Sequence, residues 1–291
     1  MSNRQSVLFP FLAALLLLAL TGCSLPSLIQ DEGTSSSSGA PQEKISGPKP
    51  VLSAAAIAGA TRSNSTDGAE MVIVPAGDFA MGDDDSEPPG RTVSLDAFWI
   101  YKTPVTAAQY RKFCQATRRE MPPAPSWGWK DDHPVVNVTW HDAAAYAEWA
   151  GAHLPTEAQW EKAARGTDAR HYPWGNEWDP GKLWCSKKTF KDAGLTAPVG
   201  SYPAGSSPYG CLDMEGNVGQ WCADWYDEDY PKSAPSANPS GPESGAYRVV
   251  RGGSWRGIHL LYVDNFRCEH RGNNDPDGRF DDTGFRCVIP G

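Results

Sequence analysis

The sequence predicts one loop-rich domain that mixes short strands with a few helices, behind an N-terminal leader. Of the 291 residues, 40% are apolar and 12 are Trp, and all the Trp lie between Trp99 and Trp255. A continuous segment of roughly 220 residues with no second linker is long enough for one large core. Short β-like pieces at 71–75, 79–81 and 93–101 are separated by Gly, Pro and Asp. This pattern predicts that loops carry much of the mass.

The first 22 residues have the features of a secretory leader. Arg4 precedes an apolar run from Val7 to Leu20, which is short for a bilayer span and is followed by Thr21-Gly22-Cys23. The stretch resembles a bacterial lipoprotein signal, and a plain cleaved signal is the alternative. The resemblance implies that Cys23 is lipidated and that the protein is anchored in the bacterial cell envelope. Ser24, in place of Asp, favours the outer membrane if the cell is Gram-negative.

Residues 23–66 are predicted to be the lipidated Cys and a flexible linker. From Ser24 to Ser65 the chain is rich in Ser, Gly, Pro and Ala and has no aromatic residue, so it cannot bury a core. An acyl-anchored domain needs such a spacer to clear the lipid headgroups. The folded domain is therefore expected over 67–291. The net charge of −9 and the dispersed basic residues argue against nucleic acid as a partner.

Three helices are predicted inside the domain from capping-box patterns. Thr106, Thr139 and Thr156 are each followed three residues later by Gln or Asp. In this pattern the two side chains satisfy backbone N–H groups that a helix start leaves without partners. The second helix has an alanine-rich face and is expected to stop at Gly151, and the third at Gly166.

A series of motifs in fixed order carries a resemblance to a known family. The motifs are 71–77 with 79–82, 103–106, 134–140, 154–160, 172–176, 216–218, 251–255 and 284–286. They resemble the formylglycine-generating enzyme family, also called the sulfatase-modifying factor domain, over residues 71–291. The resemblance implies a compact α+β fold related to C-type lectins, with little regular secondary structure.

The same resemblance shows where the family's copper chemistry would lie. In the enzymes that convert a sulfatase cysteine to formylglycine, two active cysteines follow the Gly-Gly-Ser-aromatic run. Here those positions are Gly257 and Tyr262, and neither side chain is a thiolate ligand for Cu(I). Iron-dependent relatives use a histidine and carboxylate cluster, and the six histidines here lack the spacing for one. We therefore expect neither copper nor iron, and no catalytic residue.

Six cysteines remain after Cys23, an even number in an exported chain, which permits three disulfides. They are Cys114, Cys185, Cys211, Cys222, Cys268 and Cys287. In relatives, the last two pair with cysteines on the two central helices, and the matching positions here are Ala147 and Ala164. The pairing must therefore differ, or some thiols are free. A catalytic dithiol is the alternative to structural bridges.

A calcium site is implied by the run from Asp213 to Gln220. By position in the family, the ligands would be Asp213, Gly216, Val218 and Gln220, which all offer hard oxygen donors. Relatives usually have Glu at the last position. Gln220 removes one negative charge, so we expect weaker affinity, with an empty turn as the alternative.

The segment from Arg256 to Asp282 corresponds to the family's substrate groove. Its candidate ligand-binding residues, with the preceding serine, are Ser254, Arg256, His259, Tyr262, Asp264, Asn265, His270, Asn273, Asn274 and Phe280. Polar and aromatic groups of this kind are typical of recognition surfaces.

These observations favour a non-catalytic, membrane-tethered module that binds a protein, peptide or glycan at this C-terminal face. One alternative is an oxidoreductase of the same family that modifies an envelope protein or a small thiol. A second is a ligand-binding protein diversified by a retroelement, because such variable proteins have the same fold and end in a similar segment.

Overall fold

The computed structural model describes residues 60–83, 90–185, 195–257 and 263–291. The leader, Cys23 and most of the expected linker lie outside this range, so the lipid anchor stays a prediction. No helix in these ranges is both long and apolar enough to span a membrane.

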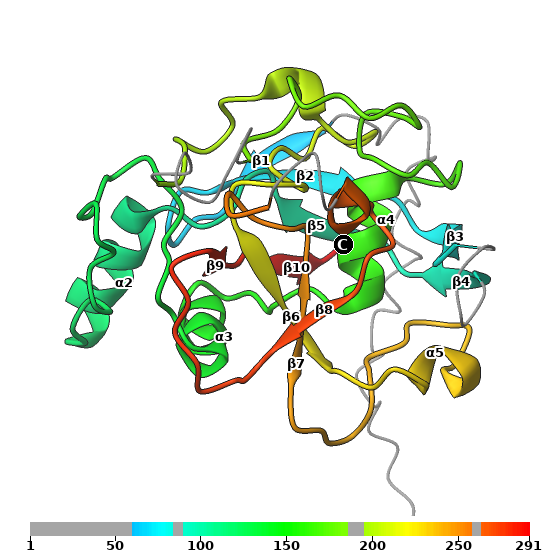
Figure 1. Ribbon diagram of the computed structural model, residues 1–291. Helices are drawn as coiled ribbons and strands as arrows, with labels where there is room; N and C mark the ends of the chain where they lie inside the picture. The colour runs from blue at the N-terminus through cyan, green and yellow to red at the C-terminus, as the bar shows by residue number, and fades with distance from the viewer. Residues whose placement is uncertain (1–59, 84–89, 186–194, 258–262) are drawn as a thin grey trace, which may run out of the picture. The chain divides into compact units, whose positions relative to one another are not determined.

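The strands that the structure describes form three sheets (Figure 1). The first is antiparallel with the order β1-β2-β5-β10, and the second is the hairpin β3-β4. The third has the order β8-β7-β6-β9, in which only β6 and β9 run parallel. The bounds are β1 Thr61–Ser63, β2 Glu70–Val74, β3 Gly77–Met81, β4 Arg91–Leu95, β5 Phe98–Tyr101, β6 Gly219–Trp225, β7 Arg248–Arg251, β8 Gly272–Asn274, β9 Thr283–Gly284 and β10 Val288–Pro290.

The three predicted helices are confirmed, together with their capping boxes. They are α2 Ala107–Thr117, α3 Trp140–Trp149 and α4 Glu157–Arg165, capped by Thr106, Thr139 and Thr156. In each case the threonine hydroxyl accepts from the backbone N–H three residues on, and that residue's side chain accepts from the threonine N–H. The remaining helical turns are α5 Tyr230–Ser233, η1 Pro203–Gly205 and η2 Val263–Phe266. Little regular structure is present, as the fold class predicts.

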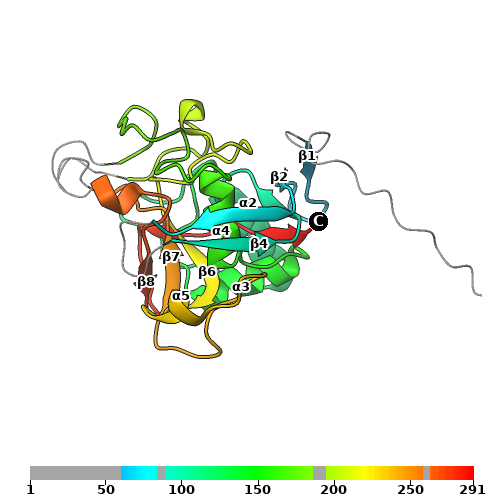
Figure 2. The ribbon, with the colours of Figure 1, turned by 90° about the vertical axis from the view of Figure 1, so that its right-hand side faces the viewer.

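Two large hydrophobic clusters hold the sheets and helices together. One joins α2 and α3 through aromatic contacts, with the rings of Tyr110 and Tyr146 stacked at 5.7 Å and Phe113 packed edge-on against both. The other joins β2, β5 and the β3-β4 hairpin to α4, whose Trp160 is fully buried. Figure 2 shows α4 beside β4, with β6 and β7 nearby.

Two boundaries differ from the sequence expectation. β1 pairs with β2, and the buried Asn64 side chain donates to the Tyr101 hydroxyl (2.8 Å) and the Ala150 carbonyl (2.9 Å), so ordered structure starts before residue 67. The piece expected at 93–101 is two strands, because the N–H of Asp96 donates to the side chain of Asn238 (3.0 Å) and leaves the strand ladder there.

The six cysteines predicted as disulfide candidates, from Cys114 onward, are all buried. Their pairing stays a prediction. They are distributed over three separate hydrophobic clusters, where they pack as small apolar side chains.

Candidate functional site

The Gly-Gly-Ser turn that follows β7 is the scaffold of the predicted groove. Gly252 and Gly253 have φ of 91° and 58°, in the left-handed region that glycine adopts without strain. A Cβ on Gly252 would overlap the Met214 carbonyl oxygen and lie 2.9 Å from the ring of Trp160. The turn therefore requires glycine for space as well as for backbone conformation.

The position of the first active cysteine of the copper enzymes is filled by an aromatic ring. A Cβ on Gly257 would overlap Cζ of Phe266 and lie 2.9 Å from its Cε2. Phe266 is fully buried, and its ring stacks on Trp178 at 5.5 Å with 27° between the planes. Because the ring is held from both sides, a side chain at position 257 has no room. Tyr262, at the second cysteine position, lies outside the described residues.

Beside this turn lies a groove of about 460 Å³. Its rim is organised by two interactions between the turn and the chain before β9. The Ser254 hydroxyl donates to Asp282 Oδ2 at 3.0 Å, and the Arg256 guanidinium contacts both oxygens of Asp281 at 2.6 and 2.7 Å. Burial raises the pKa of Asp282 and lowers that of His270, which lines the same groove. A neutral imidazole beside hydroxyl and amide groups favours hydrogen bonding over charge pairing.

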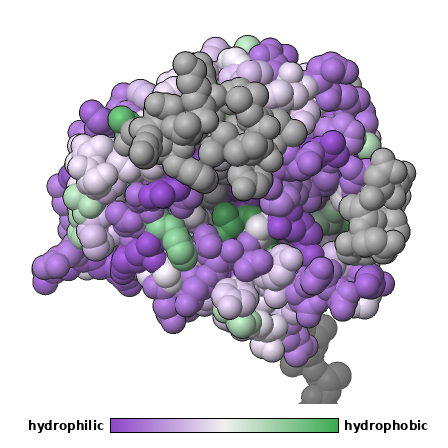
Figure 3. Space-filling view, in the orientation of Figure 1, coloured by the Kyte–Doolittle hydropathy of each residue, from purple (hydrophilic) through white to green (hydrophobic). Residues whose placement is uncertain are grey.

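The groove brings together six of the ten predicted ligand-binding residues: Ser254, Arg256, Asn265, His270, Asn274 and Phe280. Arg256 and Phe280 also line an adjoining hollow that includes Asn137 and Arg279. Asp264 lines a different cavity, and Asn273 is exposed on β8 without lining the groove. His259 and Tyr262 fall outside the described residues. On the face in Figure 3, the described residues present a mainly hydrophilic surface, with small apolar patches, one of them in a central hollow.

The residues implied for calcium lie in a buried hydrogen-bond network. Gln220 is fully buried, and its Oε1 accepts from Trp160 Nε1 (2.9 Å) and Arg286 Nε (2.6 Å). Its Nε2 donates to the carbonyl of Asp213 (2.8 Å), whose Oδ2 in turn accepts from the N–H of Gly200 (2.8 Å). Gly216 and Val218 are buried in the turn between them. Calcium therefore stays a prediction, and the occupied donor atoms of Gln220 do not favour it.

A buried charge network, which the sequence analysis missed, lies behind the groove. Arg251 of β7 is fully buried and contacts Glu157 Oε1 (2.6 Å) and Glu161 Oε2 (2.7 Å) of α4, while Arg165 contacts Glu161 Oε1 at 3.0 Å. The i, i+4 spacing of Glu157, Glu161 and Arg165 in the sequence is the only local signal, and such spacing is common on exposed helix faces. Here it lies on a buried face because β7 supplies the opposite charge.

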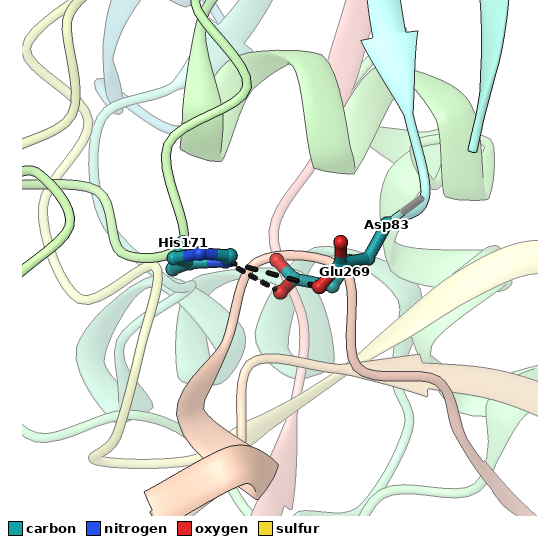
Figure 4. Close-up of side chains that lie close together, drawn as sticks. All are labelled: Asp83, His171 and Glu269. Atoms are coloured by element: carbon teal, nitrogen blue, oxygen red, sulfur yellow. Dashed lines mark hydrogen bonds and ion pairs between the residues drawn. The ribbon is translucent and has the colours of Figure 1, made fainter. Parts of the chain in front are cut away.

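A second missed cluster joins Asp83, His171 and Glu269 (Figure 4). Nδ1 of His171 lies 3.0 Å from Glu269 Oε1 and 4.0 Å from Asp83 Oδ2. One imidazole and two carboxylates can hold a divalent cation. Arg267 lies in the same place and pairs with both carboxylates, 3.5 Å from Asp83 and 3.7 Å from Glu269. The cluster therefore behaves as an ion-pair network that a metal would have to rearrange.

Five of the thiols in the described ranges are poor nucleophiles. Burial raises the pKa of Cys114 and Cys211, and raises that of Cys222, Cys268 and Cys287 well above the ordinary value. The thiolate is the reactive and metal-binding form of cysteine, and apolar burial disfavours it. The geometry therefore places no activated thiol beside the groove.

Comparisons with known proteins agree with this fold. The family model of the sulfatase-modifying factor enzyme 1-like domain matches residues 57–290. The formylglycine-generating enzyme of Streptomyces coelicolor is 38% identical over 84% of this chain and 96% of its own length. Hercynine oxygenase of Mycolicibacterium smegmatis is 34% identical, covering 67% of this chain and 56% of its own length.

Solved structures place the chain in the same fold. PvdO from Pseudomonas aeruginosa superposes with a TM-score of 0.68 and 28% identity, covering 80% of this chain and 98% of that one. Treponema denticola variable protein 1 gives a TM-score of 0.64 at 22% identity, covering 80% and 99%, a likeness of fold alone. With a family model that spans most of the chain and a relative of 38% identity over nearly its whole length, this protein belongs to the sulfatase-modifying factor (formylglycine-generating enzyme) family.

Proposed function

We propose that this chain is a lipid-anchored binding protein that uses the family scaffold without its copper-dependent chemistry. Its ligand is a polar segment of a protein, peptide or glycan, held in the groove beside the Gly-Gly-Ser turn. The observation that carries the proposal is the ring of Phe266, which takes the space next to Gly257 where the copper enzymes have a cysteine.

The remaining thiols do not offer a substitute. Cys268 lies within the segment from Arg256 to Asp282, and it is fully buried with a pKa raised well above the ordinary value by desolvation and by the charge of Glu215. Its carbonyl accepts from Arg251, which ties this part of the chain into the charge network. Bringing this thiol to a substrate would require that network to open.

The groove itself has the composition of a recognition site. Phe280 and Phe266 supply apolar surface, while Arg256, Asn265 and Asn274 supply hydrogen-bonding groups around it. Arg256 also lies 4.8 Å from the ring of Trp255, which packs edge-on against Trp127. Rigid aromatic rings beside polar groups bind a ligand at a low cost in conformational entropy.

An oxidoreductase is the second candidate, and the relatives named formylglycine-generating enzyme favour it. The full chain, purified in detergent, is incubated with a cysteine-containing sulfatase-motif peptide, oxygen and copper or iron, and the peptide is weighed by mass spectrometry. The binding proposal predicts no loss of the thiol mass. Conversion of the cysteine to an aldehyde would overturn it and establish the enzyme.

Ligand recognition is tested by applying the full chain to peptide and glycan arrays. The groove variant Arg256→Ala should lose at least ten-fold in apparent affinity for any hit. Arg111→Ala is a matched control, because Arg111 also pairs with an exposed Asp, Asp131 (2.5 Å), but on α2. Equal binding by both variants would place the site elsewhere. The anchor is tested separately, since labelled palmitate should enter the wild-type chain and not Cys23→Ser.

A further inference from the structure

A cavity of about 390 Å³ lies apart from the groove and shares only His270 with it among the described lining residues. It is bounded by the β3-β4 hairpin, the first turn of α4, the end of β6, α5 and the segment before β8. Its volume falls in the range of small-molecule sites. The two sites can therefore be tested independently.

The described lining of this cavity carries seven carboxylates against three guanidinium groups. The guanidinium groups have internal partners. Arg271 contacts both oxygens of Glu157 (2.8 and 3.0 Å), Arg267 contacts Asp264 (3.1 Å), and Arg91 donates to the carbonyls of Ala234 and Pro235. Negative charge therefore exceeds positive charge at this wall.

Two of the carboxylates have no ion pair among the described residues. Asp224 is 3% exposed, and its Oδ2 accepts from the N–H of Glu157 at 2.8 Å. Glu228 is exposed at the mouth. In addition, Oε2 of Glu269 is buried without a hydrogen-bond partner, with Arg165 4.0 Å away. A buried carboxylate without an ion pair is costly, and Asp224 leaves that cost unmet.

Other residues that line the cavity form an aromatic and apolar wall. Tyr226, Tyr230, Pro231 and Pro239 line it, and Arg271 already packs over the ring of Tyr226 with 4.9 Å between its Cζ and the ring centroid. The wall thus already holds one guanidinium between a tyrosine face and a carboxylate. Cation–π contact and charge pairing together select a positively charged group on an apolar stem.

We propose that this cavity binds an organic cation, a primary amine or guanidinium on an apolar stem, with Asp224 and Glu228 as its charge partners and the tyrosine and proline wall against its stem. The inference goes beyond the groove-binding function and does not rest on it. The cation comes either from a free amine or from a lysine or arginine side chain of a protein.

The test is calorimetric titration of the full chain with benzylamine, with benzyl alcohol as the neutral probe of similar shape. Benzylamine should bind at least ten-fold more tightly. Agmatine and acetyl-Gly-Lys-Gly-amide then separate the two sources: the peptide binds more tightly than the free amine if the natural ligand is a protein side chain. Equal binding of benzylamine and benzyl alcohol, or no binding of any amine at millimolar concentration, would overturn the proposal.

Variants locate the bound charge. Asp224→Asn keeps an oxygen that can accept from the N–H of Glu157 and should weaken benzylamine binding at least ten-fold. Glu243→Gln makes a matched change of charge at an exposed residue that is not among the described residues lining the cavity, and it should leave binding unchanged. If Asp224→Asn does not fold, Glu228→Gln at the exposed mouth should still weaken binding several-fold. The assignment would be refuted if the folded Asp224→Asn chain bound benzylamine with wild-type affinity. It would also be refuted if zinc abolished benzylamine binding while Glu228→Gln left that binding intact.

Discussion

The burial of Asp224 makes a prediction about the pH dependence of folding. Burial is the largest cause that raises its pKa, the charge of Glu157 adds to it, and the pKa is about 7 against an ordinary value of 3.8. Since the folded pKa lies above the unfolded one, the folded state holds the proton more tightly. The resulting contribution to stability is complete below pH 3.8 and is lost as the pH rises through about 7.

The size of this effect follows from the two pKa values. Relative to a side chain that cannot ionise, the raised pKa of Asp224 lowers the free energy of unfolding by about 4 kcal/mol at pH 8 and by about 2 kcal/mol at pH 5. Asp224→Asn cannot ionise and keeps an acceptor for the N–H of Glu157. Its stability relative to wild type should therefore rise by about 2 kcal/mol between pH 5 and pH 8. Above pH 8 the difference should be constant.

Urea unfolding of wild type, Asp224→Asn and Glu243→Gln at pH 5, 6, 7 and 8 measures this difference. The other charged groups facing Asp224 are Glu157 on α4, Arg271 before β8 and Arg248 on β7. The pKa of Glu157 is lowered by the two arginines that it contacts, so it stays ionised in this window. A difference between wild type and Asp224→Asn that does not change with pH would refute the reasoning that burial raises the pKa of Asp224.

Three further changes test other parts of the structure. Gly257→Cys should lower the free energy of unfolding by about 1–3 kcal/mol in thermal or urea denaturation, because its Cβ overlaps Phe266. Adding Phe266→Ala should recover part of this loss. Wild-type stability of the single variant would contradict the packing of Phe266 against position 257. In EDTA, Gln220→Glu should unfold at a lower temperature than wild type, since a second oxygen would face the Asp213 carbonyl. Addition of calcium should stabilise the variant and not the wild type. An equal calcium effect in both chains would contradict this prediction. Arg286→Met should lower the free energy of unfolding in urea by about 3 kcal/mol or more, because it leaves buried carbonyl acceptors without donors. A loss below about 1 kcal/mol would show that water replaces the missing donors.

The features that the sequence predicted well are those encoded within a few residues. The starts of α2, α3 and α4 follow from Thr106, Thr139 and Thr156, because a capping box is complete within four residues. Six of the predicted groove residues meet in space because they lie on one segment that returns along the Gly-Gly-Ser turn.

The features that the sequence did not predict depend on contacts between distant segments. His171 and Glu269 are 98 residues apart, and nothing near either one indicates the other. Asp224 has no local feature that distinguishes it from the exposed Asp227, three residues on, and its burial follows from the packing of β6 against α4.

The sequence alone identifies two departures from the family pattern, at Gly257 and Gln220. It does not show the structural consequences of either one. Gly257 removes a ligand atom, and the structure shows that Phe266 takes the space, so restoring a cysteine there meets a packed ring. Gln220 removes a charge, and its amide donates to the Asp213 carbonyl while its oxygen accepts from Arg286, so restoring the charge disturbs a satisfied network. In both places the neighbouring groups fit the present residue. The chemistry proposed for this protein must therefore come from the groove and the cavity, whose polar groups still face open space.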